Sequence, residues 1–105
     1  MARVKRVGYV YFVQDANDET APIKIGWSMN PWARLLELRA GNWRELRIIG
    51  RIPIREGDPR FGTGYGGLER QLHERFASSR IRFEWFRPHP ELLAIAREAA
   101  RAEAA

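Results

Sequence analysis

The segment from residue 7 to residue 40 constrains the fold most strongly, because its apolar pattern changes from strand-like to helical. Residues 7–14 (VGYVYFVQ) are rich in β-branched and aromatic side chains, which predicts a strand. Residues 15–22 are polar and turn-forming, and Ile23–Ser28 then alternates apolar residues with small or polar ones. We therefore expect an antiparallel hairpin in which successive residues lie on opposite faces of the sheet.

A helix is expected directly after the hairpin. Asn30 is a favoured N-cap residue and Pro31 is favoured at the first helical position, so together they predict where the helix begins. Gly41 predicts where it ends, because glycine readily adopts the left-handed conformation that follows many helices. Three apolar residues fall on one stripe of this helix and are expected to be buried: Trp32, Leu35 and Leu36.

The rest of the chain contains two further helices and two further extended segments. Leu46–Ile54 alternates as a third strand, and the glycine-rich residues 55–67 are expected to form a loop, either a simple connector or a mobile loop beside the functional site. Leu68–Ala77 and Pro90–Ala104 have helical patterns, and Ile81–Phe86 between them is expected to be extended. The predicted fold is α+β, with a small central three-stranded antiparallel sheet flanked by helices in the order β-β-α-β-α plus a C-terminal helix.

Length and cysteine content limit the classes of protein. The chain is long enough for one domain with a single core, so we expect residues 1–105 to form one domain. The absence of cysteine excludes disulfides, thiol catalysis and cysteine zinc sites. No apolar run is long enough to span a membrane and the N-terminus lacks a signal-peptide core, which predicts a cytoplasmic protein.

The charge favours a nucleic-acid partner. The 18 basic residues, nearly all arginines, exceed the 13 acidic ones and give a formal net charge of +5. Arginine binds phosphate oxygens through two parallel hydrogen bonds, so a chain of this composition suits DNA. An arginine-rich genomic base composition would produce the same excess, and the charge alone does not decide between the two explanations.

Two short motifs on the predicted strands resemble those of a known family. The motifs are Tyr9-Val10-Tyr11 and Lys24-Ile25-Gly26, and Arg34 follows on the helix at a matching distance. Further along come Glu69, in LERQLHERF, and the triplet Glu84-Trp85-Phe86. In this order the set resembles the GIY-YIG nuclease superfamily, and in particular a phage and bacterial branch whose second motif begins with lysine.

The resemblance implies a metal-dependent DNA endonuclease that hydrolyses or nicks phosphodiester bonds, with Mg²⁺ or Mn²⁺ as its cofactor. Glu69 would bind the metal, since Mg²⁺ often takes only one or two protein carboxylates. Arg34 would bind the phosphate and stabilise charge in the transition state. Simpler roles are open for both residues. Glu69 could be a solvated carboxylate paired with His73 or Arg70, and Arg34 could be an ion-pair partner of Glu37.

Three more residues are assigned to the chemistry by the same resemblance. Tyr11 would activate or orient the attacking water, but a tyrosine with a pKa near ~10 needs a nearby cation to act as a base. Lys24 stands where the family has a tyrosine, so it either pairs with phosphate or lowers the pKa of Tyr11, or else the site is altered. His73 would be a general base or a hydrogen-bond partner of the phosphate, or simply a half-buried histidine beside Phe76.

The remaining assignments concern contact with DNA. Tyr9 could share the role of Tyr11 or could only pack within the sheet. Glu84 is expected to form an ion pair with Arg80 or Arg82. The residues expected to contact DNA lie on the first two strands, in the loop and after the second helix: Tyr9, Gly26, Arg55, Arg60 and Arg80.

Two alternatives to an active nuclease are consistent with the sequence. One is a catalytically silent DNA-binding module of the same fold, and the other is a protein-interaction domain that docks through exposed aromatics such as Trp43 and Tyr65. The chain has no room for a separate DNA-reading domain. Target selection would therefore depend on a homodimer or on a separate targeting partner, or it would be weak.

Overall fold

The computed structural model describes residues 3–105. The predicted hairpin is present as β1 (Val7–Asp15) and β2 (Ile23–Ser28). It is followed by α1 (Pro31–Arg39) and β3 (Leu46–Arg55), close to their predicted bounds. The second half of the chain consists of α2 (Leu68–Arg75), the 3-10 turn η1 (Ala77–Ser79), β4 (Arg80–Arg82), β5 (Trp85–Phe86) and α3 (Pro90–Ala104).

The strands form one antiparallel sheet of five strands in the order β3-β1-β2-β5-β4. The α+β class is confirmed, but the prediction of a three-stranded sheet was wrong. The two additional strands extend the sheet beyond β2, where Ile23 pairs with Phe86 and Lys24 pairs with Trp85.

The additional strands come from the segment that was predicted to be a single extended stretch. The chain reverses at Phe83, whose φ of 53° lies in the left-handed region. Arg82 therefore pairs with Trp85 across a tight turn. Such turns normally contain glycine or asparagine, and a bulky residue rarely adopts this conformation. The sequence consequently carries no signal for this hairpin.

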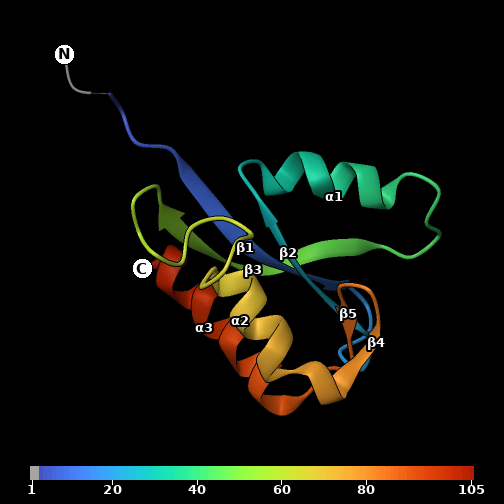
Figure 1. Ribbon diagram of the computed structural model, residues 1–105. Helices are drawn as coiled ribbons and strands as arrows, with labels where there is room; N and C mark the ends of the chain where they lie inside the picture. Colours follow the sequence, from blue (N-terminus) through green and yellow to red (C-terminus); the bar gives the residue numbers. More distant parts are fainter. Residues whose placement is uncertain (1–2) are drawn as a thin grey trace.

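The sheet lies between two layers of helix (Figure 1). On one face Val10, Phe12 and Ile25 are buried together with residues of α2 and α3, including Leu72 and Leu92. On the other face a smaller cluster of four buried residues lies under α1: Tyr11, Val13, Leu35 and Leu46. The alternation predicted for the first strand is therefore confirmed, since its odd and even residues belong to different clusters.

α1 begins and ends as predicted, but its buried face is narrower than predicted. The Asn30 side chain accepts a hydrogen bond of 3.1 Å from the Ala33 backbone, and Gly41 has a φ of 75° just beyond the helix. Leu35 is buried, whereas Trp32 and Leu36 are 55% and 48% exposed, so the predicted stripe was wrong at these two positions. Among the described helices, only α1 covers this face of the sheet, and no neighbouring helix covers its sides (Figure 1).

Within residues 3–105, none of the helices is both long enough and apolar enough to cross a membrane.

Candidate active site

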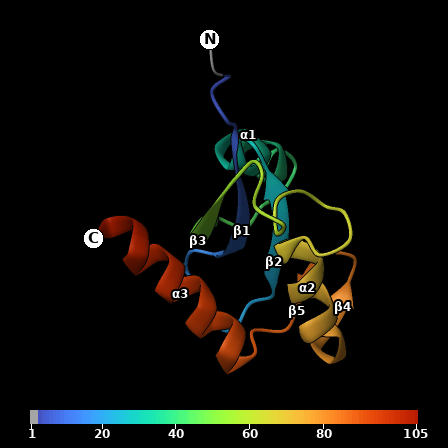
Figure 2. The ribbon, with the colours of Figure 1, turned by 60° about the vertical axis from the view of Figure 1, so that its left-hand side comes forward.

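The candidate site lies where the neighbour of β2 changes from β5 to α2. The last link to the hairpin is a hydrogen bond of 2.9 Å from the Ile25 backbone N–H to the Glu84 carbonyl oxygen. The carbonyl oxygen of the same Ile25 lies 2.9 Å from the His73 ring on α2. Figure 2 shows α2 beside β2 and the β4–β5 hairpin. Side chains from β1, α1, α2 and the β4–β5 hairpin lie around this part of β2.

Tyr11 reaches the site by passing beneath Gly26. The two residues are opposite one another in the β1–β2 pairing. A Cβ atom on Gly26 would lie only 2.4 Å from the Tyr11 hydroxyl oxygen, so a larger residue at this position would displace the ring. Gly26 was predicted to contact DNA. It is buried, and its role in the structure is to leave room for Tyr11.

The Tyr11 hydroxyl is protonated at neutral pH. Burial raises the pKa of Tyr11 above its ordinary value, and interaction with the Arg34 guanidinium offsets only part of this increase. The nearby carboxylates of Glu84 and Glu69 raise the pKa further. The net direction is opposite to the lowered pKa that the sequence suggested for a tyrosine beside Lys24.

Arg34 projects from α1 toward the Tyr11 hydroxyl. Its own pKa is raised, first by the hydrogen bond with Tyr11 and then by the charge of Glu37. Arg34 and Glu37 form an ion pair of 2.6 Å on the helix surface. The structure therefore combines the two roles considered for Arg34, because it pairs with Glu37 and also lies at the site.

Lys24 forms an ion pair with Glu84. The Lys24 side chain is buried, and this pair holds its ammonium group close to the Glu84 carboxylate. The expectation that Glu84 pairs with Arg80 or Arg82 was therefore wrong. The hairpin register explains the difference, because it aligns Lys24 with Trp85, the residue next to Glu84.

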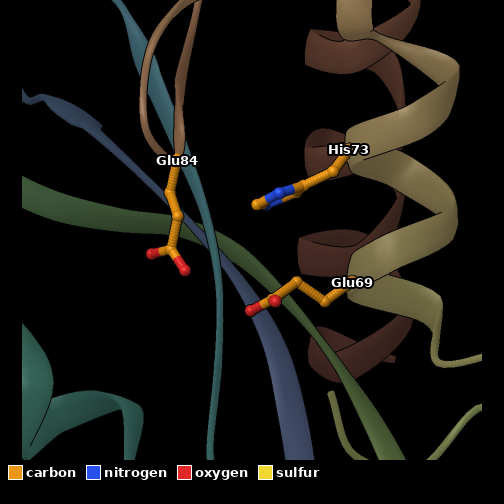
Figure 3. A group of neighbouring side chains, drawn as sticks. All are labelled: Glu69, His73 and Glu84. Carbon is orange, nitrogen blue, oxygen red and sulfur yellow. The ribbon is translucent and has the colours of Figure 1, made fainter. Parts of the chain in front are cut away.

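Glu69 lies in the first turn of α2, half-buried and directed toward the hairpin (Figure 3). Burial raises its pKa to about 7, the charge of Glu84 adds to this increase, and the charge of Lys24 opposes it. Glu69 is thus not the solvated surface carboxylate considered as an alternative. Arg70, the partner considered for it, instead pairs with Glu74 at 3.3 Å.

His73 is held by hydrogen bonds at both of its ring nitrogens. Nε2 lies 2.9 Å from the Ile25 carbonyl oxygen, which can only accept. Nδ1 lies 3.3 Å from the Arg80 guanidinium, which can only donate. Together these partners assign the proton to Nε2 and the lone pair to Nδ1. The ring also packs edge-on against Phe86 at a centroid distance of 5.1 Å. His73 therefore links α2 to β2, and neither of its ring nitrogens is free to act as a base.

Glu69, His73 and Glu84 form a group that could hold a cation, since their ligand atoms lie within 4.8 Å of one another (Figure 3). Because both His73 nitrogens are engaged, the two carboxylates are the available donors. Carboxylate oxygens are the ligands that Mg²⁺ and Mn²⁺ prefer. A cation would also offset the repulsion between the carboxylates that raises the Glu69 pKa. The residues present fit a hard divalent cation, with Lys24 as a competing partner of Glu84.

The structure brings Arg80 to the site but turns Tyr9 away from it. Arg80 donates to His73, which bonds to β2 beside Glu84. The Tyr9 ring instead lies under the Arg51 guanidinium of β3, at 4.4 Å from the ring centroid. Tyr9 therefore belongs to the β3 side of the sheet, in agreement with the packing role considered for it.

Arg55 and Arg60, which were predicted to contact DNA, lie next to different elements of the fold. Arg55 is the last residue of β3, which is separated from β2 by β1. Arg60 pairs with Asp58 at 2.9 Å in the segment that leads into α2. Phe61, the next residue, packs edge-on against Trp27 at 5.0 Å and anchors this segment to β2. Arg60 is thus on the α2 side of the molecule, whereas Arg55 is on the β3 side.

Glu84 is the residue of this site that the sequence did not assign to it. Its place at the site depends on the tight reversal at Phe83, for which the sequence gives no turn signal. The neighbouring Trp85 and Phe86 indicated only that the segment is anchored in the core.

Comparison with known protein families gives a match to the T5orf172 domain over residues 8–103. No curated protein and no solved structure matches the chain.

Proposed function

We propose that this chain, which belongs to the T5orf172 domain family, is a metal-dependent DNA endonuclease with a GIY-YIG-type site. The domain is found in phage and bacterial proteins and is often linked to nucleases. One observation carries the proposal: a guanidinium, a buried tyrosine hydroxyl and two carboxylates meet at one point on β2. Hydrolysis of a phosphodiester needs groups that bind phosphate beside groups that bind a cation, and this arrangement supplies both.

In the proposed reaction, Arg34 binds the scissile phosphate. Its guanidinium is half-exposed and beside the Tyr11 hydroxyl, so DNA can reach it from solvent. Arginine donates two parallel hydrogen bonds to phosphate oxygens and stabilises the charge that develops there. Removing one such preorganised donor costs an enzyme roughly 100- to 1,000-fold in rate.

Glu69 and Glu84 would hold Mg²⁺ or Mn²⁺ in this proposal. A cation there supplies charge neutralisation at the phosphate and lowers the pKa of bound water. Lys24 keeps the Glu84 carboxylate in place through their ion pair. Glu69 must lose its proton before it binds a cation, because its pKa of about 7 leaves it partly protonated at neutral pH.

Tyr11 orients the attacking water rather than removing its proton. The raised pKa keeps the hydroxyl neutral, so it can accept a hydrogen bond from Arg34 and donate one toward the phosphate or the water. His73 acts as a positioning residue, because its fixed tautomer joins α2, and hence Glu69, to the backbone of β2.

One observation favours a second candidate, a DNA-binding module that does not cut. The Lys24 ammonium already neutralises Glu84, so the site contains a positive charge without any metal. Such a module would bind DNA with strong salt dependence and would show no metal-dependent cleavage.

Conversion of supercoiled plasmid to nicked or linear DNA distinguishes the two. We expect wild-type protein to cut in Mg²⁺ or Mn²⁺ and not in EDTA, and we expect Arg34→Ala and Glu69→Gln to lose at least about 100-fold in rate. Arg97→Ala is the matched control, because Arg97 is an exposed arginine on α3 whose partner is Glu19 at 3.6 Å. Equal cutting by all four proteins would contradict the site. Binding without cutting by the wild type would favour the silent module.

A further inference from the structure

A concavity of about 570 Å³ is lined by Phe83 and Trp85, the residues on either side of Glu84 in the sequence. It is formed by the loop between β1 and β2, the segment before β3 and the β4–β5 hairpin. Its main aromatic, charged and polar lining residues are Phe83, Trp85, Arg44, Arg82, Asn42 and Asp15. Glu84 stands between Phe83 and Trp85 in the sequence, so this cavity adjoins the candidate active site.

Two arginines of the cavity stack on exposed aromatic rings. The Arg82 guanidinium lies 5.0 Å from the centroid of the Phe83 ring, and that of Arg44 lies 5.3 Å from the centroid of Trp43. The Phe83 side chain is 73% exposed and Trp43 is 89% exposed. Exposed aromatic rings combined with arginine planes are the surfaces on which unpaired nucleobases stack.

The backbone of Phe83 supports a role for its ring outside the fold. At a φ of 53°, glycine would occupy this turn without strain, whereas a phenylalanine is strained there. The ring offers little compensation through burial, because it projects into solvent at the tip of the hairpin. A strained and exposed aromatic residue at the edge of a cavity indicates a contact with a ligand.

The polar residues of the cavity suit the edge of a base. Asn42 carries an amide donor at Nδ2, while its Oδ1 accepts a hydrogen bond of 2.9 Å from the Arg44 backbone N–H. Asp15 Oδ1 accepts a hydrogen bond of 2.9 Å from the Asn17 backbone N–H, and each carboxylate oxygen can accept a second bond from the edge of an unpaired base. Arg44 lies 3.4 Å from Asp15, which keeps the two charges balanced inside the cavity. Arg82 adds positive charge at the entrance, where the phosphate of the same nucleotide would lie.

We infer that this cavity binds an unpaired nucleobase, so that the substrate of the site beside it is DNA containing single-stranded nucleotides. The identification of the strand as DNA rests on the proposed nuclease function. The cavity is lined by residues other than those that would hold the metal. A base in the cavity would fix the register of the strand, which would place a nearby phosphate at the Glu84 side of the hairpin.

The test is equilibrium binding in EDTA, where no cutting occurs. Fluorescence anisotropy would compare a labelled single-stranded oligonucleotide with the duplex of the same sequence, using the full chain. Phe83→Gly removes the ring and also relieves the strained turn, so its thermal stability should equal or exceed that of the wild type. We expect this variant to bind the single strand about 5- to 150-fold more weakly, with little change for the duplex.

Two further variants make the result specific. Phe83→Trp keeps an aromatic surface and should retain single-strand binding. Trp32→Ala is the matched control, because Trp32 is also exposed and stacked by an arginine, Arg39, but lies against β3 instead of this cavity. Its single-strand affinity should be unchanged.

Several outcomes would overturn the inference: unchanged single-strand binding by Phe83→Gly, an equal loss for single strand and duplex, or the same loss in Trp32→Ala. Tighter binding of a hexaglutamate peptide than of either DNA would also overturn it and would assign the cavity to an acidic protein segment. Plasmid cutting is not part of this measurement. A protein that fails to cut can still pass it, and an active nuclease can fail it, so the two proposals are tested separately.

Discussion

Replacing Glu69 with glutamine should stabilise the metal-free protein at alkaline pH. The folded protein raises the pKa of Glu69 from 4.5 to about 7, mainly through burial. Folding therefore favours the protonated carboxyl, and this contribution to stability is present below about pH 4.5 and is lost as the pH rises through 7. Glutamine resembles the protonated form and does not titrate. The variant should thus not show the decrease in the free energy of unfolding that the wild type shows at pH 8.

The size of the effect follows from the difference between the two pKa values. Each unit of difference in pKa corresponds to about 1.4 kcal/mol. A carboxyl whose pKa rises from 4.5 to about 7 therefore sets an upper limit of roughly 3 kcal/mol on the change in stability. Glu69 is only half-buried, and water screens part of this energy. We expect Glu69→Gln to raise the free energy of unfolding by about 1–3 kcal/mol at pH 8. In a domain of this size that corresponds to roughly 5–15 °C in Tm.

Thermal unfolding of both proteins at pH 4 and pH 8, in EDTA, measures this directly. The two Tm values should nearly agree at pH 4, below the ordinary pKa of 4.5, and differ at pH 8. Replacing EDTA with Mn²⁺ at pH 8 should then raise the Tm of the wild type and leave that of Glu69→Gln unchanged, because the proposed cation site needs the Glu69 carboxylate. Other titrating groups, such as the Glu56 carboxyl with its pKa of about 2, are shared by both proteins and cancel. The same difference at both pH values, or a less stable variant at pH 8, would refute the reasoning.

Two further predictions test how the site is held. Gly26→Ala should abolish cleavage by displacing the Tyr11 hydroxyl, which a Cβ would approach to 2.4 Å, whereas Gly64→Ala, with no atom within 4 Å, should retain wild-type rates in the plasmid assay. Lys24→Met should lower the free energy of unfolding by about 1–3 kcal/mol, because it leaves Glu84 without its partner, while water reaches the Glu84 side chain, which is 39% exposed, and screens part of the loss. Adding Glu84→Gln should recover part of that loss in a double-mutant cycle by urea unfolding, and additive losses would exclude coupling between the two residues.

The elements with strong local signals could be predicted from the sequence. Alternating apolar residues placed the first two strands and the third, and Asn30 and Pro31 placed the start of α1. The last helix was predicted with its observed bounds, Pro90–Ala104. These features depend on residues close together in the chain, which is why a single sequence is enough to find them.

The parts that could not be predicted depend on contacts between distant residues. The β4–β5 hairpin turns at Phe83 against the usual preference of a bulky residue, so only its pairing with β2 reveals it. That pairing is what brings Glu84 to Lys24 and Glu69. Trp32 was expected to be buried because its helical position is apolar. Its exposure depends on the absence of a neighbouring helix among the described residues, which periodicity does not report.

The order of the elements in the chain determines when the candidate site can be completed during translation. Tyr11, Arg34 and Glu69 leave the ribosome before Glu84, which sits on a hairpin that can pair only with a β2 that is already in place. A nascent chain that ends after α2 lacks the second carboxylate and leaves Lys24 without its partner. The group of Glu69, His73 and Glu84 that could hold a cation is therefore incomplete until translation has passed the hairpin. If the proposed nuclease function holds, a chain that ends before the hairpin would not cut DNA, because it lacks Glu84.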